Sequence, residues 1–257
     1  MKDGVTLCRL AVMLVLSIAA AGCGASEFVK QFEYEEDITL ALDGSATVIV
    51  NESIPALVAL RGLPLEPEPT ARLDRGLLRR LYEAPGVDVT RVSRPWRRRG
   101  RRFVQIRLDV ADVRALASAA PFSWSTYALE SDGNLMTYRQ VVGPAANPSL
   151  TTAVSWAGTE LVAVRLHLPS RIVFHNAPSR AVERGNILSF EQTLADRLAG
   201  QPISIEVRME PQSILRRTLT VFGAAVAAAL SVLLAAVYWV WRRGRSSTIK
   251  PDSRDAA

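Results

Sequence analysis

The chain has 257 residues, of which 49% are hydrophobic, and a formal net charge of +6 from 31 basic and 25 acidic side chains. It contains two cysteines and two histidines. This composition excludes a small disulfide-rich scaffold and leaves few ligands for a zinc site. Arginine far outnumbers lysine, so the position of the arginines carries more information than the net charge.

The N-terminal segment has the pattern of a signal peptide. Lys2 and Arg9 form a basic start, residues 10–21 are apolar, and the small residues of Ala-Ala-Gly precede Cys23. The pattern resembles the lipobox of bacterial lipoproteins, which implies removal of residues 1–22 and acylation of Cys23, for example with palmitate. An ordinary signal peptide and an uncleaved helix are the alternatives. Cys8 lies in the removed segment, so the mature chain would form no intramolecular disulfide.

A second apolar segment lies near the C-terminus. Residues 219–240 contain no charged side chain, and as a helix they would span about 33 Å, enough to cross a bilayer. We expect a transmembrane helix over 215–241, followed by a basic cytoplasmic tail over 242–257. A cleaved signal would then place residues 23–214 on the extracytoplasmic side of a bacterial cytoplasmic membrane.

Residues 23–214 read as one α+β domain with a mostly antiparallel sheet and two or three short helices. Strand pairs flank the Gly-containing turns at 43–45 and 131–133, and a strong strand covers 160–168. Helices are expected over 54–63 and from an N-cap at Thr70 to Leu81. The acidic residues near the start of the first strand are expected to form a solvated edge: Glu33, Glu35, Glu36 and Asp37.

An arginine-rich segment, SRPWRRRGRR, separates two strand-like stretches at 87–92 and 103–110 and is expected to form the tip of the hairpin that they make. Guanidinium groups bind phosphate in a bidentate manner, and tryptophan favours the lipid headgroup interface. The segment therefore predicts a site for lipid headgroups or another anionic envelope component, with a solvated loop as the alternative; nucleic acid is not expected outside the cytoplasm. The predicted site consists of Arg94, Trp96, Arg97, Arg98, Arg99, Arg101 and Arg102.

The region 167–200 holds both histidines and several carboxylates. His167 and His175 match no standard metal-ligand spacing, so no metal and no cofactor are expected. A hydrolase could use His175 as a base oriented by Glu191 or Asp196, but the sequence offers no nucleophile motif. The sequence therefore predicts a protein that is not an enzyme.

Several features of the chain together resemble the LppM-like family of bacterial membrane-anchored lipoproteins. These are the lipobox, the first strand EYEEDITLALDGSATV, a late strand after Pro169, and a motif formed by Gly185, Asn186, Leu188, Phe190 and Leu194, with Phe190 where the family pattern has tryptophan. The resemblance implies a mixed αβ domain similar to small lipid-binding folds that binds envelope glycolipids. It assigns no functional residue here.

The sequence thus predicts a non-enzymatic envelope lipoprotein anchored by acylated Cys23 and one transmembrane helix. In this hypothesis the acyl chain holds the start of the sheet on the same membrane and turns the arginine-rich segment toward it. The alternative is an assembly subunit whose transmembrane helix pairs with another membrane protein through small residues such as Gly223 and Ala227.

Overall fold

The predicted first hairpin is present in the structure, a computed structural model that describes residues 30–146 and 156–246. Strands β1 (Gln31–Leu40) and β2 (Ala46–Ser53) pair antiparallel from Tyr34↔Glu52 to Leu40↔Ala46. The turn between them uses Gly44 at φ +91°, a conformation that glycine adopts without strain.

Sheet A is the larger of two sheets and has the order β10-β8-β1-β2-β5-β3, with a short β4 paired to β5. Its remaining strands are β3 (Val87–Val92), β4 (Trp96–Arg98), β5 (Arg101–Val110), β8 (Glu160–His167) and β10 (Ile187–Thr193). The pairing is antiparallel except between β1 and β8, which run parallel. The prediction of a mostly antiparallel sheet is therefore confirmed.

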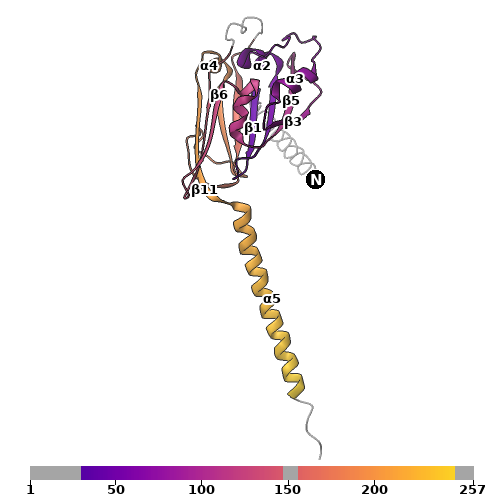
Figure 1. Cartoon of the computed structure of the whole chain (residues 1–257), viewed down its shortest axis with the longest axis vertical. Coiled ribbons are helices and arrows are strands. Elements are labelled where there is room, and N and C mark those ends of the chain that lie inside the picture. Colours follow the sequence, from indigo (N-terminus) through magenta and orange to yellow (C-terminus); the bar gives the residue numbers. More distant parts are fainter. Residues whose placement is uncertain (1–29, 147–155, 247–257) are drawn as a thin grey trace, which may run out of the picture.

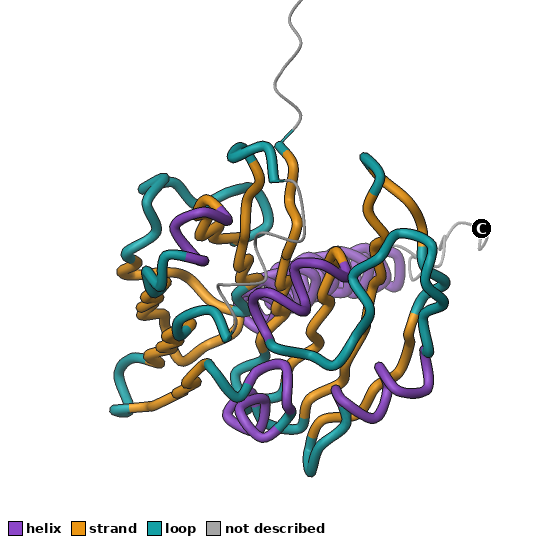
Figure 2. Tube along the Cα trace, turned by 90° about the horizontal axis from the view of Figure 1, so that it is seen from above, coloured by secondary structure: helices purple, strands orange, loops and turns teal. Residues whose placement is uncertain are grey.

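Sheet B has the order β6-β7-β11-β9 and is antiparallel throughout. Its strands are β6 (Ser125–Ser131), β7 (Met136–Val142), β9 (Ser170–His175) and β11 (Ile203–Ser213). Apolar side chains of both sheets form one core. The domain is therefore a two-layer structure with helices at its ends and sides (Figures 1 and 2).

Short helices complete the domain. Helix α2 (Ile54–Arg61) is buried on all sides, capped by the Ser53 hydroxyl and ended by Gly62 at φ +63°. Helix α3 (Arg75–Tyr82) is capped by Asp74, so the predicted N-cap at Thr70 is wrong: the leucine pattern extends further back than the helix. The others are η1 (Val113–Ser118), η2 (Ala120–Phe122) and α4 (Leu194–Leu198).

The long helix α5 (Ile214–Ser246) follows β11 without a linker. Its segment Arg217–Arg243 is long and apolar enough to cross a membrane, and none of its most apolar part is buried. In the described part of the chain this is the one helix that meets those criteria. Figure 1 shows α5 leaving the domain at one end of the sheets.

The strand directions define two ends of the domain. The near end carries the junction of β11 with α5. The remote end carries α2 and α4 (Figure 1). Because Ser53, the N-cap of α2, pairs with Phe103, the start of β5 lies at the remote end. The start of β1 lies there too, since Tyr34 pairs with Glu52.

Gly143 lies where β7 ends against the start of β6, and its amide donates to the Trp124 carbonyl at 2.9 Å. A Cβ at this position would collide with that carbonyl oxygen, which is backbone and cannot rotate away. We expect Gly143→Ala to lower the free energy of unfolding by about 2–3 kcal/mol in urea unfolding. Gly223→Ala, on an open surface of α5, is the control; an equal effect of both variants would contradict this account.

Candidate functional site

The arginine-rich segment forms the narrow tip of a hairpin between β3 and β5, as the sequence predicts. β4 pairs with the start of β5 through Trp96↔Phe103 and Arg98↔Arg101. The two residues between them, Arg99 and Gly100, both have positive φ, at 49° and 75°. Two left-handed residues form the type I′ turn that suits the twist of a two-residue hairpin. We call residues 94–102 the basic hairpin.

Arg101, the first residue after the turn of the basic hairpin, is held inside the fold. Its guanidinium contacts Glu33 at 2.5 Å and Glu160 at 3.0 Å, and it lies 4.7 Å from the centre of the Trp156 ring. Both carboxylates are buried. Arg101 therefore ties β5 to the starts of β1 and β8 and is not presented to a ligand.

Arg102 is also buried. It donates to the carbonyl of Ala71 at 2.5 Å and to that of Glu66, and burial, followed by the charge of Arg97, lowers its pKa. Arg97 donates to the Pro69 carbonyl at 3.1 Å. These bonds attach the proline-rich segment, residues 63–71 with prolines at 64, 67 and 69, to the basic hairpin. They explain how that segment is ordered without regular structure.

A groove of about 270 Å³ runs between the proline-rich segment and the basic hairpin. Trp96 forms part of its wall, with 40% of its surface exposed and its ring stacked 5.9 Å from Phe103. Arg72 and Arg97 lie on the same groove and are exposed. The groove therefore combines an aromatic face with guanidinium groups. The lining residues are Pro69, Thr70, Ala71, Arg72, Leu73, Pro95, Trp96, Arg97 and Arg102.

The remaining arginines of the predicted site, Arg94, Arg98 and Arg99, are exposed. The structure thus divides the predicted site residues into two groups. Five of them, Trp96 with Arg94, Arg97, Arg98 and Arg99, are available to a ligand. Arg101 and Arg102 are used by the fold. Cys23, the predicted lipidation site, lies outside the described residues.

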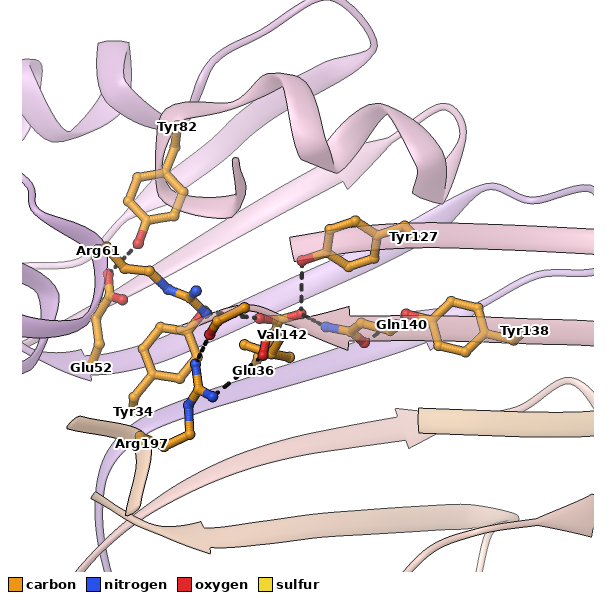
Figure 3. Close-up of polar contacts among 11 residues, drawn as sticks. Tyr34, Glu36, Glu52, Arg61, Tyr82, Tyr127, Tyr138, Gln140, Val142 and Arg197 are labelled. Atoms are coloured by element: carbon orange, nitrogen blue, oxygen red, sulfur yellow. Dashed lines mark hydrogen bonds and ion pairs between the residues drawn. The ribbon is translucent and has the colours of Figure 1, made fainter. Parts of the chain in front are cut away.

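A second polar cluster lies between the two sheets (Figure 3). Glu36 of β1 accepts hydrogen bonds from Tyr34 at 2.9 Å, and from Gln140 at 2.9 Å and Tyr127 at 3.4 Å on sheet B. Tyr138 donates to Gln140 at 2.8 Å. All of these side chains are buried. The cluster therefore links the two layers through polar contacts at the centre of the core.

Arg61, at the end of α2, supplies the positive charge of this cluster. Its guanidinium lies 3.8 Å from Glu36 and 4.7 Å from the centre of the Tyr34 ring. Desolvation lowers the pKa of Arg61, but the negative charges around it, which include Glu36, outweigh that effect and raise the pKa. Within the described residues, two of its nitrogens, Nε and Nη1, are buried without a hydrogen-bond acceptor.

Glu52 on β2 accepts a hydrogen bond from Tyr82 at 2.6 Å. Burial raises the pKa of Glu52 to about 8, against the smaller opposing effects of Tyr82 and Arg61. The carboxyl is therefore mostly neutral at pH 7. Burial also raises the pKa of the tyrosines Tyr34, Tyr82, Tyr127 and Tyr138, which stay protonated as donors.

Arg197 of α4 is the largest buried side chain of the described core. It donates to the carbonyls of Val142, Gly143 and Gln201 at the remote end of sheet B (Figure 3). Desolvation, with a contribution from the charge of Arg61, lowers its pKa to about 10. Carbonyl dipoles take the place of a carboxylate partner here.

The buried cluster corrects the prediction of a solvated acidic edge. Glu33 and Glu36 are buried, whereas Glu35 and Asp37 lie on the outer face of sheet A, paired with Arg165 at 2.5 Å and His167 at 2.8 Å. The period-2 pattern of β1 could have placed Glu36 beside inward-facing Tyr34 and Ile38. Because the cluster is closed to solvent, it is suited to holding the layers together, not to binding a substrate.

The structure does not assemble the alternative hydrolase site. His175 lies on sheet B, while Glu191 on sheet A pairs with Lys30 at 2.7 Å and Asp196 accepts from Thr193 at 2.6 Å. The two histidines lie on different sheets. In the described ranges, no group of three or more histidine, cysteine or acidic side chains is placed to hold a metal ion.

The late motif that carries the family resemblance has a structural role. Gly185 and Asn186 adopt positive φ, and Asn186 donates to the carbonyls of Leu168, at 2.8 Å, and Ser170. Leu188, Phe190 and Leu194 belong to the core. The motif therefore fixes the connection by which the chain passes from β8 in sheet A to β9 in sheet B.

No protein-family model and no curated protein matches this chain. Among solved structures, the chain is similar to the NMR structure of the folded domain of Mycobacterium tuberculosis LppM, with a TM-score of 0.41 and 11% sequence identity. The match covers 72% of this chain and 94% of that one. This similarity is too distant to transfer a function, so the proposals below rest on the residues of this chain.

Proposed function

We propose that this protein is a membrane-anchored, non-enzymatic lipoprotein of a bacterial envelope that binds an anionic envelope component through its basic hairpin. The observation that carries the proposal is the exposed group formed by Arg98 and Arg99 at the tip and by Arg94 before β4, beside a groove lined by Trp96 and Arg97. Acylation at Cys23 and a membrane-spanning α5 are part of this proposal.

The chemistry of the basic hairpin favours a phosphate-bearing or carboxylate-bearing ligand. A guanidinium can donate two parallel hydrogen bonds to such a group, and Arg97 already lies on the groove. The exposed face of Trp96 offers an apolar contact next to these charges. Because Arg101 and Arg102 are fixed inside the fold, the base that presents these groups is rigid, which reduces the entropy lost on binding.

The test uses the full chain in zwitterionic nanodiscs, titrated with inorganic polyphosphate at several salt concentrations. We expect binding that weakens with salt and that drops about a hundredfold in the hairpin triple variant R94Q/R98Q/R99N, since each basic residue contributes about fivefold. Asparagine is used at position 99 because it tolerates positive φ.

The control triple variant, R91Q/R107Q/R184Q, removes the same charge from exposed arginines outside the basic hairpin. It is expected to bind polyphosphate nearly as well as the wild type. An equal loss in both variants would show that net charge, not the hairpin, controls binding. A membrane protein that co-purifies with wild type and hairpin variant alike would instead favour the assembly role through α5.

A further inference from the structure

We infer that the basic hairpin docks on an anionic lipid surface facing the membrane that α5 crosses, so that the domain bridges the two surfaces. This inference rests on the proposed anion-binding function and identifies the ligand as the headgroups of an opposing membrane. It replaces the expectation that the arginine-rich segment lies on the bilayer that anchors the chain.

The basic hairpin lies at the remote end of the domain. β5 begins at Arg101, at the remote end, and runs 10 residues to Val110 near the end that carries α5. At about 3.3 Å per residue, this strand is about 33 Å long. The hairpin tip at Arg99 therefore lies a full strand length beyond the near end of the domain, which is well outside the headgroup layer that α5 enters.

Several bonds hold the junction between the domain and α5. The Ile214 amide donates to the Pro169 carbonyl at 3.1 Å, and the Ser170 hydroxyl donates to the Gln212 carbonyl at 2.6 Å. Arg171 pairs with Glu210 at 3.1 Å. These bonds connect the start of β9 to the end of β11 and the first residue of α5, so they oppose folding of the domain down onto its own bilayer.

The chain enters the domain at the remote end. Lys30 precedes β1 there, and Arg101, directly after the turn of the basic hairpin, contacts Glu33 at the start of β1. Six residues lie between Cys23 and Lys30, and the seven Cα–Cα steps reach at most about 25 Å. This reach is shorter than β1 is long, at about 33 Å. Cys23 therefore cannot reach the level of the near end, which favours a surface at the remote end for its acyl chain.

The shape and chemistry of the tip favour lipid over a soluble polymer. The turn is only two residues wide and carries Arg98 and Arg99 with Trp96 behind them. A narrow, basic tip with an adjacent half-exposed tryptophan can enter a headgroup layer, where guanidinium binds phosphate and the indole lies at the interface.

The experiment uses two vesicle populations. The full chain is reconstituted in phosphatidylcholine vesicles with a donor dye, and protein-free acceptor vesicles contain phosphatidylcholine with or without phosphatidylglycerol. We expect clustering, measured by energy transfer and light scattering, only with phosphatidylglycerol in the acceptor vesicles. The hairpin triple variant should need at least about tenfold more protein for the same clustering, whereas the control triple variant should match the wild type.

Placing phosphatidylglycerol in the protein-bearing vesicles as well tests binding to the same membrane. We expect clustering to persist, because the tip does not reach its own bilayer. Loss of clustering in that arrangement would overturn the inference. Polyphosphate binding without any clustering would also overturn it while leaving the proposed function intact, and failure of both measurements would reject both.

Discussion

Replacing Arg61 by methionine is expected to lower the free energy of unfolding by about 3–5 kcal/mol. The variant leaves Glu36 fully buried, with hydrogen bonds from Tyr34 and Gln140 but without the neighbouring positive charge. An uncompensated buried carboxylate is far more costly than the loss of an exposed pair. Urea unfolding followed by tryptophan fluorescence measures the change.

A double-mutant cycle separates the charge effect from packing. Glu36→Gln keeps an acceptor for the buried donors and should be destabilising alone, because Arg61 is then unpaired. The double variant Glu36→Gln/Arg61→Met removes both charges and should recover at least about 2 kcal/mol relative to additivity. The exposed pair Glu130–Arg139, at 2.9 Å, is the control, with coupling below about 1 kcal/mol. Additive single effects at Glu36 and Arg61 would contradict the account.

Raising the pH from about 5 to about 9 is expected to destabilise the wild type more than Glu52→Gln. Glu52 has a pKa of about 8 in the folded protein, compared with about 4.3 for an unfolded chain. Between these values the folded state retains a proton that the unfolded state has lost. The stabilisation is therefore complete below the unfolded pKa and is lost as the pH rises through the folded one.

The expected difference between the two proteins is at most about 4 kcal/mol, with a slope of at most about 1.4 kcal/mol per pH unit. Other groups titrate in the same range, so the measured quantity is the difference between wild type and Glu52→Gln at each pH. Glutamine is neutral and similar in size to the protonated acid, and its carbonyl oxygen can still accept the hydrogen bond from Tyr82. If both proteins show the same pH slope, Glu52 is ionised in the folded state and the account of its burial is wrong.

The local parts of the fold were predictable from the sequence. The β1–β2 and β6–β7 hairpins follow from period-2 alternation around Asp-Gly turns, and α2 follows from a short apolar run closed by Gly62. The strand order of sheet A was not predictable, because β1 pairs in parallel with β8, far along the chain. Such long-range pairing has no local sequence signal.

The candidate site was only partly predictable. The sequence identifies the arginines around Trp96 but cannot show that Arg101 and Arg102 turn inward, because their partners Glu160 and Ala71 belong to other segments. The same reason explains the missed burial of Glu36, whose partners Arg61 and Gln140 are distant in sequence. The position of the basic hairpin at the end remote from α5 appears only once strand pairing is known.

The height of the basic hairpin above the bilayer distinguishes a domain that faces away from its own membrane from one that lies on it. A fluorophore introduced at position 99 as a non-natural amino acid, in the full chain reconstituted in nanodiscs, can be measured by energy transfer to labelled lipids; a second position, Asn134 in the β6–β7 turn, gives the reference at the near end. We predict that position 99 lies roughly 30 Å farther from the bilayer than position 134. Equal heights, or position 99 in the headgroup layer, would contradict a domain that presents its basic hairpin away from its own membrane.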